Sequence, residues 1–166
     1  MANETMRMSA AGMSELRRRE SVVLHYYNDS ANNCTFGVGT LAHLGGCTGE
    51  ELARTVTVAQ VNASLAGRVA SAEETVRRRV TRHSLTQEQF DALVSFTFNA
   101  GATGARRTLD AADRGSHADV ATNMTHHVFV HPRDGHGRRG PAVRSTGLVN
   151  RRREEVAPFQ PAAAPR

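Results

Sequence analysis

The chain has 166 residues, of which 39% are hydrophobic and 22% are charged. This balance is typical of a globular protein and excludes a disordered or fibrous chain, and no stretch reaches the ~18 apolar residues that a membrane span needs. All 21 basic residues are arginines, and the formal net charge of +5 with a pI of about 10.5 favours an anionic partner such as nucleic acid, a membrane surface or an acidic cell-wall polymer.

The first expected element is a helix near the N-terminus. Ser14 is a suitable N-cap residue for it. The apolar positions that follow at helical spacing are Leu16, Val23 and Tyr26. The pattern ends near Tyr27, and residues 28–33 are rich in the Asn, Asp and Ser that form turns.

A short β-rich patch follows the turn. Residues 34–40 read Cys-Thr-Phe-Gly-Val-Gly-Thr, in which β-prone side chains are punctuated by glycine, and this pattern predicts a short bent strand or hairpin. Gly45 and Gly46 end the patch. The expected β content is therefore small and local.

The chain then reads as helix. Thr48 and Glu51 form a capping box that opens a short helix. A continuous helical stripe runs over residues 57–80, and its apolar positions are Val58, Val61, Leu65, Val69, Ala72, Val76 and Val80. At about 1.5 Å per residue this helix spans roughly 35 Å, which is long enough to join two lobes.

Further helices are expected up to residue 156. Thr86 and Gln89 form a second capping box before residues 90–98, the most apolar segment, and Gly101 and Gly104 interrupt the pattern that follows. A helix is expected from about Ala105 to Arg114, and Ser116 with Asp119 indicates the start of another that ends near His127. Residues 131–141 are expected to form an exposed loop, followed by a helix over Leu148–Val156 and a frayed tail. The fold class is therefore α+β, mostly α.

Three polar residues are the strongest candidates for chemistry. Glu20 lies near the end of the first helix, Asp29 in the turn and Thr35 at the start of the strand, and a helix that runs into a hairpin brings such groups around one cleft. Cleavage of a glycosidic bond uses two carboxyl groups, one to protonate the leaving oxygen and one to activate water or stabilise the oxocarbenium-like transition state. This spacing alone is weak evidence, because Asp in turns and Glu on helices are common.

A family resemblance strengthens this interpretation. The run Glu20-x8-Asp29-x5-Thr35, followed by Phe-Gly-Val-Gly, resembles the active-site signature of phage-type lysozymes, the endolysin muramidases of glycoside hydrolase family twenty-four. Residues 85–101 are similar to the family's central helix, and residues 147–154 resemble its C-terminal Gly-Leu-x-x-Arg-Arg-x-x-Glu segment. The three blocks lie in order over roughly residues 15–159.

The resemblance implies one lysozyme-like catalytic domain over residues 1–166, without a metal or an organic cofactor. Its parts would be a small β-containing N-terminal lobe over about 13–57, a connecting helix over about 58–80, a helical C-terminal lobe over about 81–159 and a flexible tail over 160–166.

The resemblance also implies roles for individual residues. Glu20 would be the general acid, Asp29 the second carboxylate and Thr35 the group that orients water. Asn99 and Arg152 would bind substrate, and Arg151 or Arg152 would pair with Glu20 and hold its rotamer. Packing in the core or on a solvated helix face is an equally good explanation of Asn99, Arg151 and Arg152.

Some positions depart from the family pattern. The family often has His shortly after its second glycine, where this chain has Thr40, and His43 stands three residues further on. Residues 32–34 are Asn-Asn-Cys where Gly and an aromatic residue are frequent, and the chain has no Trp. These departures concern the walls of the cleft and leave the three candidate catalytic positions intact.

The two cysteines flank the β patch. A disulfide between Cys34 and Cys47 would close a loop of about 14 residues and stabilise the fold by about 3 kcal/mol, which suits an oxidising compartment such as the periplasm. Two separate buried thiols are the alternative. A zinc site that combines both cysteines with His43 is disfavoured, because the chain has no Cys-x-x-Cys pair.

The remaining clusters favour no specific ligand. Histidines 126, 127, 131 and 136 have irregular spacing among Gly and Arg, which indicates a solvated loop rather than a metal site. The arginine triplets at 17–19, 77–79 and 151–153 are far apart in a chain with 5% aromatic residues, so a general attraction to anionic wall polymer explains them more simply than nucleic-acid binding.

The expected function is hydrolysis of the β-1,4 bond between N-acetylmuramic acid and N-acetylglucosamine in bacterial peptidoglycan. The alternatives are a lytic transglycosylase acting on the same bond and a basic helical nucleic-acid-binding protein. Residues 1–19 lack the apolar run of a signal peptide, so we expect synthesis in the cytoplasm without a Sec signal and action in the periplasm or cell wall. Release through a holin pore, or injection by a secretion system with a cognate immunity protein, would deliver a monomer that does not insert stably into membranes.

Overall fold

The computed structural model describes residues 2–29, 32–131 and 138–161. Contacts between Cα atoms divide the chain into two compact units. The first, here called the helical unit, comprises Met1–Leu16, Val69–Phe129 and Ser145–Arg166. The second, the sheet unit, comprises Arg17–Arg68 and Val130–Arg144.

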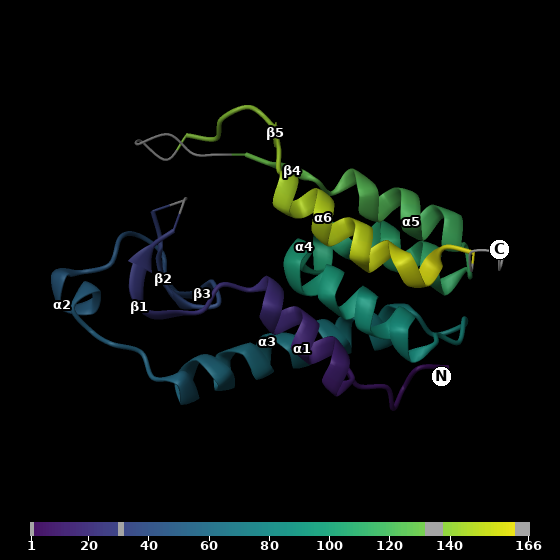
Figure 1. The fold of residues 1–166 in the computed structure, drawn as a ribbon, viewed down its shortest axis with the longest axis horizontal. Coiled ribbons are helices and arrows are strands. Elements are labelled where there is room, and N and C mark those ends of the chain that lie inside the picture. The colour runs from purple at the N-terminus through teal and green to yellow at the C-terminus, as the bar shows by residue number, and fades with distance from the viewer. Residues whose placement is uncertain (1, 30–31, 132–137, 162–166) are drawn as a thin grey trace, which may run out of the picture. The chain divides into compact units, whose positions relative to one another are not determined.

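The molecule is mostly helical with small antiparallel sheets, as predicted (Figure 1). The helices are α1 (Ala10–Arg19), α2 (Gly49–Leu52), α3 (Val58–Arg79), α4 (Gln87–Asp113), α5 (His117–His126) and α6 (Thr146–Val156), followed by a 3-10 turn over Ala157–Phe159. The strands are β1 (Val23–Asn28), β2 (Cys34–Gly37), β3 (Thr40–His43), β4 (Phe129–Val130) and β5 (Val143–Arg144).

The sheet unit is built on an antiparallel sheet in the order β1-β2-β3. The chain turns between β2 and β3 through Gly37 and Gly39, whose φ angles of 63° and 75° lie in the left-handed region that favours glycine. A Cβ atom on Gly37 would also meet Val61 Cγ2 of α3 at 3.2 Å. Arg68 of α3 donates to the carbonyl oxygen of Val38 and holds this turn.

The helical unit has the larger core. Helices α4, α5 and α6 pack against one another in it and are drawn side by side in teal, green and yellow (Figure 1). Its fully buried large side chains include Leu16, Val76, Val80, Phe90, Leu93, Val94, Phe96, Leu109, Val120 and Met124. The sheet unit buries far fewer large apolar side chains, so we expect the disulfide and the hydrogen bonds to contribute a larger share of its stability.

Several predicted helical features are confirmed. The apolar stripe predicted over 57–80 is found on α3 and on Val80, which directly follows it, and all its members except Val58, which is 58% exposed, are buried. Thr48 and Thr86 each cap a helix through a complete capping box, with Glu51 and Gln89 as the reciprocal partners. These predictions succeed because both signals are local to one helix.

The predicted first helix is wrong in its bounds. Helix α1 ends at Arg19, and Val23–Asn28 forms strand β1. Three apolar residues fitted the helical period, but the segment is dense in β-branched and aromatic side chains, and pairing with β2 decides its structure. Ser14 lies inside α1, and the hydroxyl of Ser9 accepts from the backbone N–H of Gly12 in the capping role predicted for Ser14.

Other differences lie in the second half of the chain. The helical pattern breaks at Gly101 alone, with φ 74° and ψ 165°, and continues through Gly104. Ser116 makes no side-chain cap hydrogen bond at the start of α5. Strands β4 and β5 were not predicted; they lie on either side of residues 132–137, the part of the expected loop that falls outside the described residues. Among the described residues, no helix combines the length and the hydropathy that a membrane crossing requires.

Candidate active site

Asp29 is positioned by a tight turn at the end of β1. Its backbone N–H donates to the carbonyl oxygen of Asn33 at 3.0 Å, and its carbonyl oxygen accepts from the N–H of Asn32 at 2.9 Å. Its carboxylate oxygen Oδ1 accepts from the N–H of Asn33, four residues further on, at 2.9 Å. Two backbone–backbone hydrogen bonds thus close the turn, and a third hydrogen bond holds the carboxylate of a half-buried residue that directly follows a strand.

Thr35 joins this carboxylate from the neighbouring strand. It lies on β2, 2% exposed, and its hydroxyl Oγ1 is 3.4 Å from Asp29 Oδ2 and 3.3 Å from the carbonyl oxygen of Asn33. A hydroxyl has one proton to donate and two lone pairs with which to accept. The pair therefore presents a carboxylate and a hydroxyl side by side, which is suited to holding a water molecule.

Tyr27 is a neighbour of this pair that was not predicted to take part. It is the register partner of Thr35 across the β1–β2 ladder. Burial, followed by the negative charge of Asp29, raises the pKa of the Tyr27 phenol, against a smaller lowering by Arg68. Tyr27 therefore stays a neutral hydrogen-bonding group at neutral pH. The sequence analysis missed Tyr27 because its position opposite Thr35 follows from the register of β1 and β2, and this segment was predicted to be helix.

The segment before α2 braces the Asp29 turn. Cys34 and Cys47 form a disulfide, with their Cα atoms 4.6 Å apart. The N–H of Cys47 donates to Asn28 Oδ1 at 2.7 Å, and the N–H of Gly45 donates to Asn33 Oδ1 at 3.1 Å. One covalent bond and these hydrogen bonds fasten the residues on both sides of Asp29.

Glu20 belongs to the same unit as this pair. It is the residue that directly follows α1, and it is half-buried. The sheet unit thus contains all three candidate catalytic residues, Glu20, Asp29 and Thr35, and a hydrogen bond joins Thr35 to Asp29.

Asn99 and Arg152 meet each other in the helical unit. Arg152 is 1% exposed, and its guanidinium donates to Asn99 Oδ1, to Glu155 and, at 3.1 Å, to the carbonyl oxygen of His127. It also lies over the ring of Phe96 at 4.7 Å. These contacts hold α6 against α4, and the roles predicted for Asn99 and Arg152 toward a saccharide, and for Arg151 or Arg152 toward Glu20, stay predictions.

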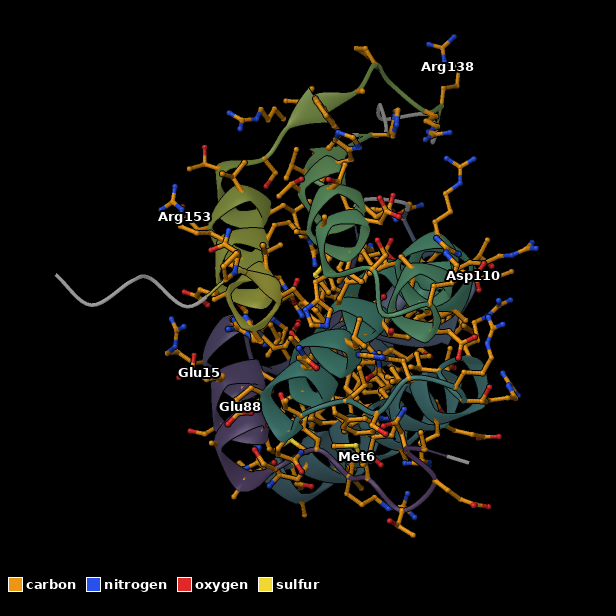
Figure 2. The ribbon with its side chains drawn as sticks, turned by 90° about the vertical axis from the view of Figure 1, so that its right-hand side faces the viewer. Met6, Glu15, Glu88, Asp110, Arg138 and Arg153 are labelled. Carbon is orange, nitrogen blue, oxygen red and sulfur yellow. A yellow bond between two sulfur atoms is a disulfide. The ribbon has the colours of Figure 1, made fainter. Side chains whose placement is uncertain are left out.

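The three arginines of α6 differ in their surroundings. Figure 2 shows Arg153 pointing away from the helix, in agreement with its exposure, whereas Arg151 and Arg152 are buried. Arg151 donates to Glu155 Oε1 at 3.0 Å, and Ser95 donates to the same oxygen at 2.6 Å. The buried acid Glu155 was not singled out in the sequence, although it lies three and four residues after the two arginines that it pairs with.

Among the described residues, one group of side chains has the donor types of a metal site. One donor atom each from Cys34, His43 and Glu51 lies within 4.8 Å of the others. His126, His127 and His131 belong to no such cluster among the described residues, and His136 falls outside those residues. Because Cys34 is in a disulfide, its sulfur is not a thiolate ligand in this state.

Comparisons with known proteins agree with this architecture. The family model of phage lysozymes matches residues 17–155. The chain is 34% identical over 97 residues to the endolysin of Salmonella phage P22, an alignment that covers 58% of this chain and 64%, just under two thirds, of that protein.

Two solved structures are similar over nearly their full length. An endolysin from Escherichia coli O157:H7 phage FAHEc1 matches with a TM-score of 0.75 and 28% identity, covering 98% of both chains. The muramidase domain of SpmX from Asticaccaulis excentricus matches with a TM-score of 0.73 and 25% identity, covering 92% of this chain and 97% of that one. With the family model matched over Glu20, Asp29, Thr35 and most of the remaining chain, this protein belongs to the phage lysozyme family.

Proposed function

We propose that this chain is a muramidase that hydrolyses the β-1,4 bond between N-acetylmuramic acid and N-acetylglucosamine in bacterial peptidoglycan and so lyses bacterial cells. The observation that carries the proposal is the carboxylate–hydroxyl pair of Asp29 and Thr35, held by the turn after β1 inside the region that matches the phage lysozyme family. The similarity to an endolysin and to a muramidase domain supports the same activity. In this proposal the two units are the lobes of one catalytic domain.

The roles of the three residues follow from the chemistry of glycoside cleavage. The protonated carboxyl group of Glu20 donates its proton to the glycosidic oxygen as the bond from C1 to that oxygen breaks. A water molecule held by Thr35 Oγ1 and Asp29 attacks C1 from the opposite face and gives its proton to Asp29. The products are two sugar chains, one with a new reducing end of inverted configuration.

The inverting route is proposed because the hydroxyl of Thr35 beside the Asp29 carboxylate offers a place for the nucleophilic water. A retaining enzyme uses its second carboxylate as the nucleophile and has no need of such a water-holding partner in the first step. Neither route calls on a metal or an organic cofactor.

The setting of the enzyme follows from its substrate. Peptidoglycan lies outside the cytoplasmic membrane, so we propose action in the periplasm or cell wall of a host or target bacterium. Holin-dependent release and injection by a secretion system both deliver a folded monomer there. A gene for an immunity protein beside this one would favour the injected form.

Zymography on peptidoglycan with point variants tests the assignment. Glu20→Gln and Asp29→Asn are expected to lower lysis by at least about two orders of magnitude, the usual contribution of a general acid or base. Thr35→Ala is expected to lower kcat with little change in KM, because it loses the water-holding hydroxyl and no sugar contact. Glu50→Gln, the same change at an exposed glutamate of the sheet unit, should leave lysis unchanged.

The structure of the products separates hydrolysis from transglycosylation. Mass spectrometry of digested wall in oxygen-18 water should show reducing ends that carry one heavy oxygen. Anhydro-muropeptides as the sole products would replace the hydrolase with a lytic transglycosylase. Full lysis by both carboxyl variants, with circular dichroism showing folded proteins, would remove the catalytic assignment. The comparisons give no support to a nucleic-acid-binding function.

A further inference from the structure

We propose that the reduced protein binds one zinc ion through Cys34, Cys47, His43 and Glu51, a site that exists only when the disulfide between the two cysteines is open. The proposal concerns a different set of side chains from the candidate catalytic residues and does not depend on the proposed function. It rests on the positions of the donor atoms and on the hydrogen bonds that orient them.

The strand register brings the first two ligands together. Cys34 and His43 are directly opposite each other in the antiparallel β2–β3 ladder. Cys47 Sγ is bonded to Cys34 Sγ, so the fourth donor atom is next to the first. Glu51 reaches the same region from α2, and donor atoms of Cys34, His43 and Glu51 all lie within 4.8 Å of one another.

The distances suit a tetrahedral zinc ion. With zinc–nitrogen and zinc–oxygen bonds of about 2.0–2.2 Å and zinc–sulfur bonds of about 2.3 Å, tetrahedral geometry separates ligand atoms by roughly 3.3–3.8 Å. His43 Nε2 is 3.0 Å from Glu51 Oε1, so these two atoms need to open by only a few tenths of an ångström. Reduction breaks the bond between the two sulfurs, which can then move apart to two corners of the tetrahedron around the zinc ion.

The hydrogen bonds around His43 and Glu51 already have the arrangement that metal ligands need. His43 Nδ1 is 3.0 Å from the carbonyl oxygen of Leu44, which leaves Nε2 for the metal. Glu51 Oε2 accepts from the N–H of Thr48 at 2.7 Å in the capping box, which leaves Oε1. In the disulfide form, a proton on His43 Nε2 joins the imidazole to Glu51 Oε1. Zinc would take the place of that proton.

The chemistry balances without a bound cofactor. The disulfide takes up two electrons and two protons from a dithiol reductant, which becomes a disulfide, and gives two thiols. Zinc then binds both sulfurs as thiolates and releases their two protons, together with the Nε2 proton of His43 when that ring is charged. Two thiolates, one imidazole and one carboxylate form a set that zinc accepts. Exchange with a small-molecule disulfide, which takes up the two electrons and two protons and leaves as two thiols, would re-form the bond between Cys34 and Cys47 and release the zinc ion.

Zinc titration of the reduced full-length chain tests the proposal. A phosphine reductant is suitable, because it opens the disulfide with water as the source of oxygen and binds zinc less than a dithiol does. Competition with a chromophoric chelator should give one tightly bound zinc in the reduced protein and none at the same concentrations in the oxidised protein. Cobalt substituted for zinc should give the visible bands of a tetrahedral ion together with thiolate-to-cobalt charge transfer.

Matched variants separate this site from two thiols that simply capture a metal. His43→Ala and Glu51→Gln should each weaken zinc binding by about tenfold to a hundredfold, whereas His25→Ala and Glu50→Gln, at exposed positions of the same unit, should not. Equal affinity of all four variants would overturn the proposal, and so would binding to the oxidised protein or no binding at all.

Thermal unfolding of the reduced protein distinguishes zinc binding to the folded state from zinc binding to the unfolded chain. A ligand that prefers the native state raises the melting temperature, and the stabilisation grows with the logarithm of its concentration over its dissociation constant; a metal that prefers unfolded cysteines lowers the melting temperature. Zinc should therefore raise the Tm of the reduced protein and leave that of the oxidised protein unchanged. A fall in Tm on adding zinc would contradict a folded four-ligand site.

Discussion

Glu155 shows how one buried carboxylate organises several side chains in the helical unit. It is 1% exposed, and it accepts from Ser95, Arg151 and Arg152. A buried charge is tolerated only when it is paired and hydrogen-bonded, and removing one partner leaves the others uncompensated. Here both guanidinium groups donate to the same acid, Arg151 to Oε1 and Arg152 to Oε2.

We therefore expect Glu155→Ala to lower the free energy of unfolding by about 3–5 kcal/mol. Denaturant titration of the purified protein measures this change. Glu154→Ala removes the same charge one residue earlier, on the exposed side of α6, and should cost no more than about 1 kcal/mol. Similar losses in the two variants would show that the buried network contributes nothing beyond a surface charge.

His127 offers a second test at the scale of one residue. Its ring packs edge-on against Phe96 at 5.2 Å, and burial, with smaller contributions from the charges of Arg152 and His126, lowers its pKa. The folded protein thus binds this proton less readily than the unfolded chain. His127 therefore costs the folded state no stability above the ordinary histidine pKa of about 6.5, where the ring is neutral in both states. As the pH falls below this value and through the lower pKa of the folded state, the folded protein loses stability relative to the unfolded chain.

The variant His127→Phe keeps an aromatic ring and cannot be protonated. Its unfolding free energy should therefore fall less between pH 7 and pH 5 than that of the unmodified protein. His25→Phe, at an exposed histidine of β1, should leave the pH dependence as it is. A steeper loss of stability in the His127 variant than in the unmodified protein would contradict the direction of the shift.

At the scale of elements, the long helix α4 contains one break that its backbone can make only at glycine. Gly101 has φ 74° and ψ 165°, a region that side-chain-bearing residues avoid at a cost of about 1–3 kcal/mol. Nothing lies within 4 Å of a Cβ atom built at this position. The cost of a substitution there is therefore one of backbone conformation and not of packing.

Two glycine-to-alanine variants should consequently change stability in opposite directions. Gly101→Ala is expected to lower the free energy of unfolding by about 1–3 kcal/mol. Gly67→Ala, at an exposed position of α3 where a Cβ also meets nothing within 4 Å, should raise it by about 0.5–1 kcal/mol, because alanine favours the helix. Thermal melts of both variants check this, and a stable Gly101→Ala protein would mean that α4 can straighten.

The same elements show what could be predicted from the sequence. Helix α3 was found because its period extends over six turns, and the turn that holds Asp29 against Thr35 was placed because six residues of local sequence define it. Strand β1 was missed because its structure depends on pairing with β2. The hydrogen bond from Arg152 to Asn99 was not predicted for a similar reason, since Asn99 lies 53 residues away on another helix.

At the scale of the whole molecule, the excess of arginine should govern how the proposed muramidase finds peptidoglycan. The formal net charge is +5, and peptidoglycan carries carboxylates on its peptide stems. The range of that attraction shrinks from about 30 Å at 0.01 M salt to about 8 Å at 0.15 M. We expect the rate of lysis of wall fragments, followed by the fall in turbidity, to decrease several-fold over this range of salt concentration.

The rate of cleavage of an uncharged chitin-type oligosaccharide should change little with salt, because this substrate lacks those carboxylates. Arg107→Gln with Arg153→Gln, both exposed, removes two positive charges and should flatten the salt dependence on wall fragments. Equal salt dependence of the rates on charged and uncharged substrates would show that salt acts on the catalytic step and not on the association of the protein with its substrate.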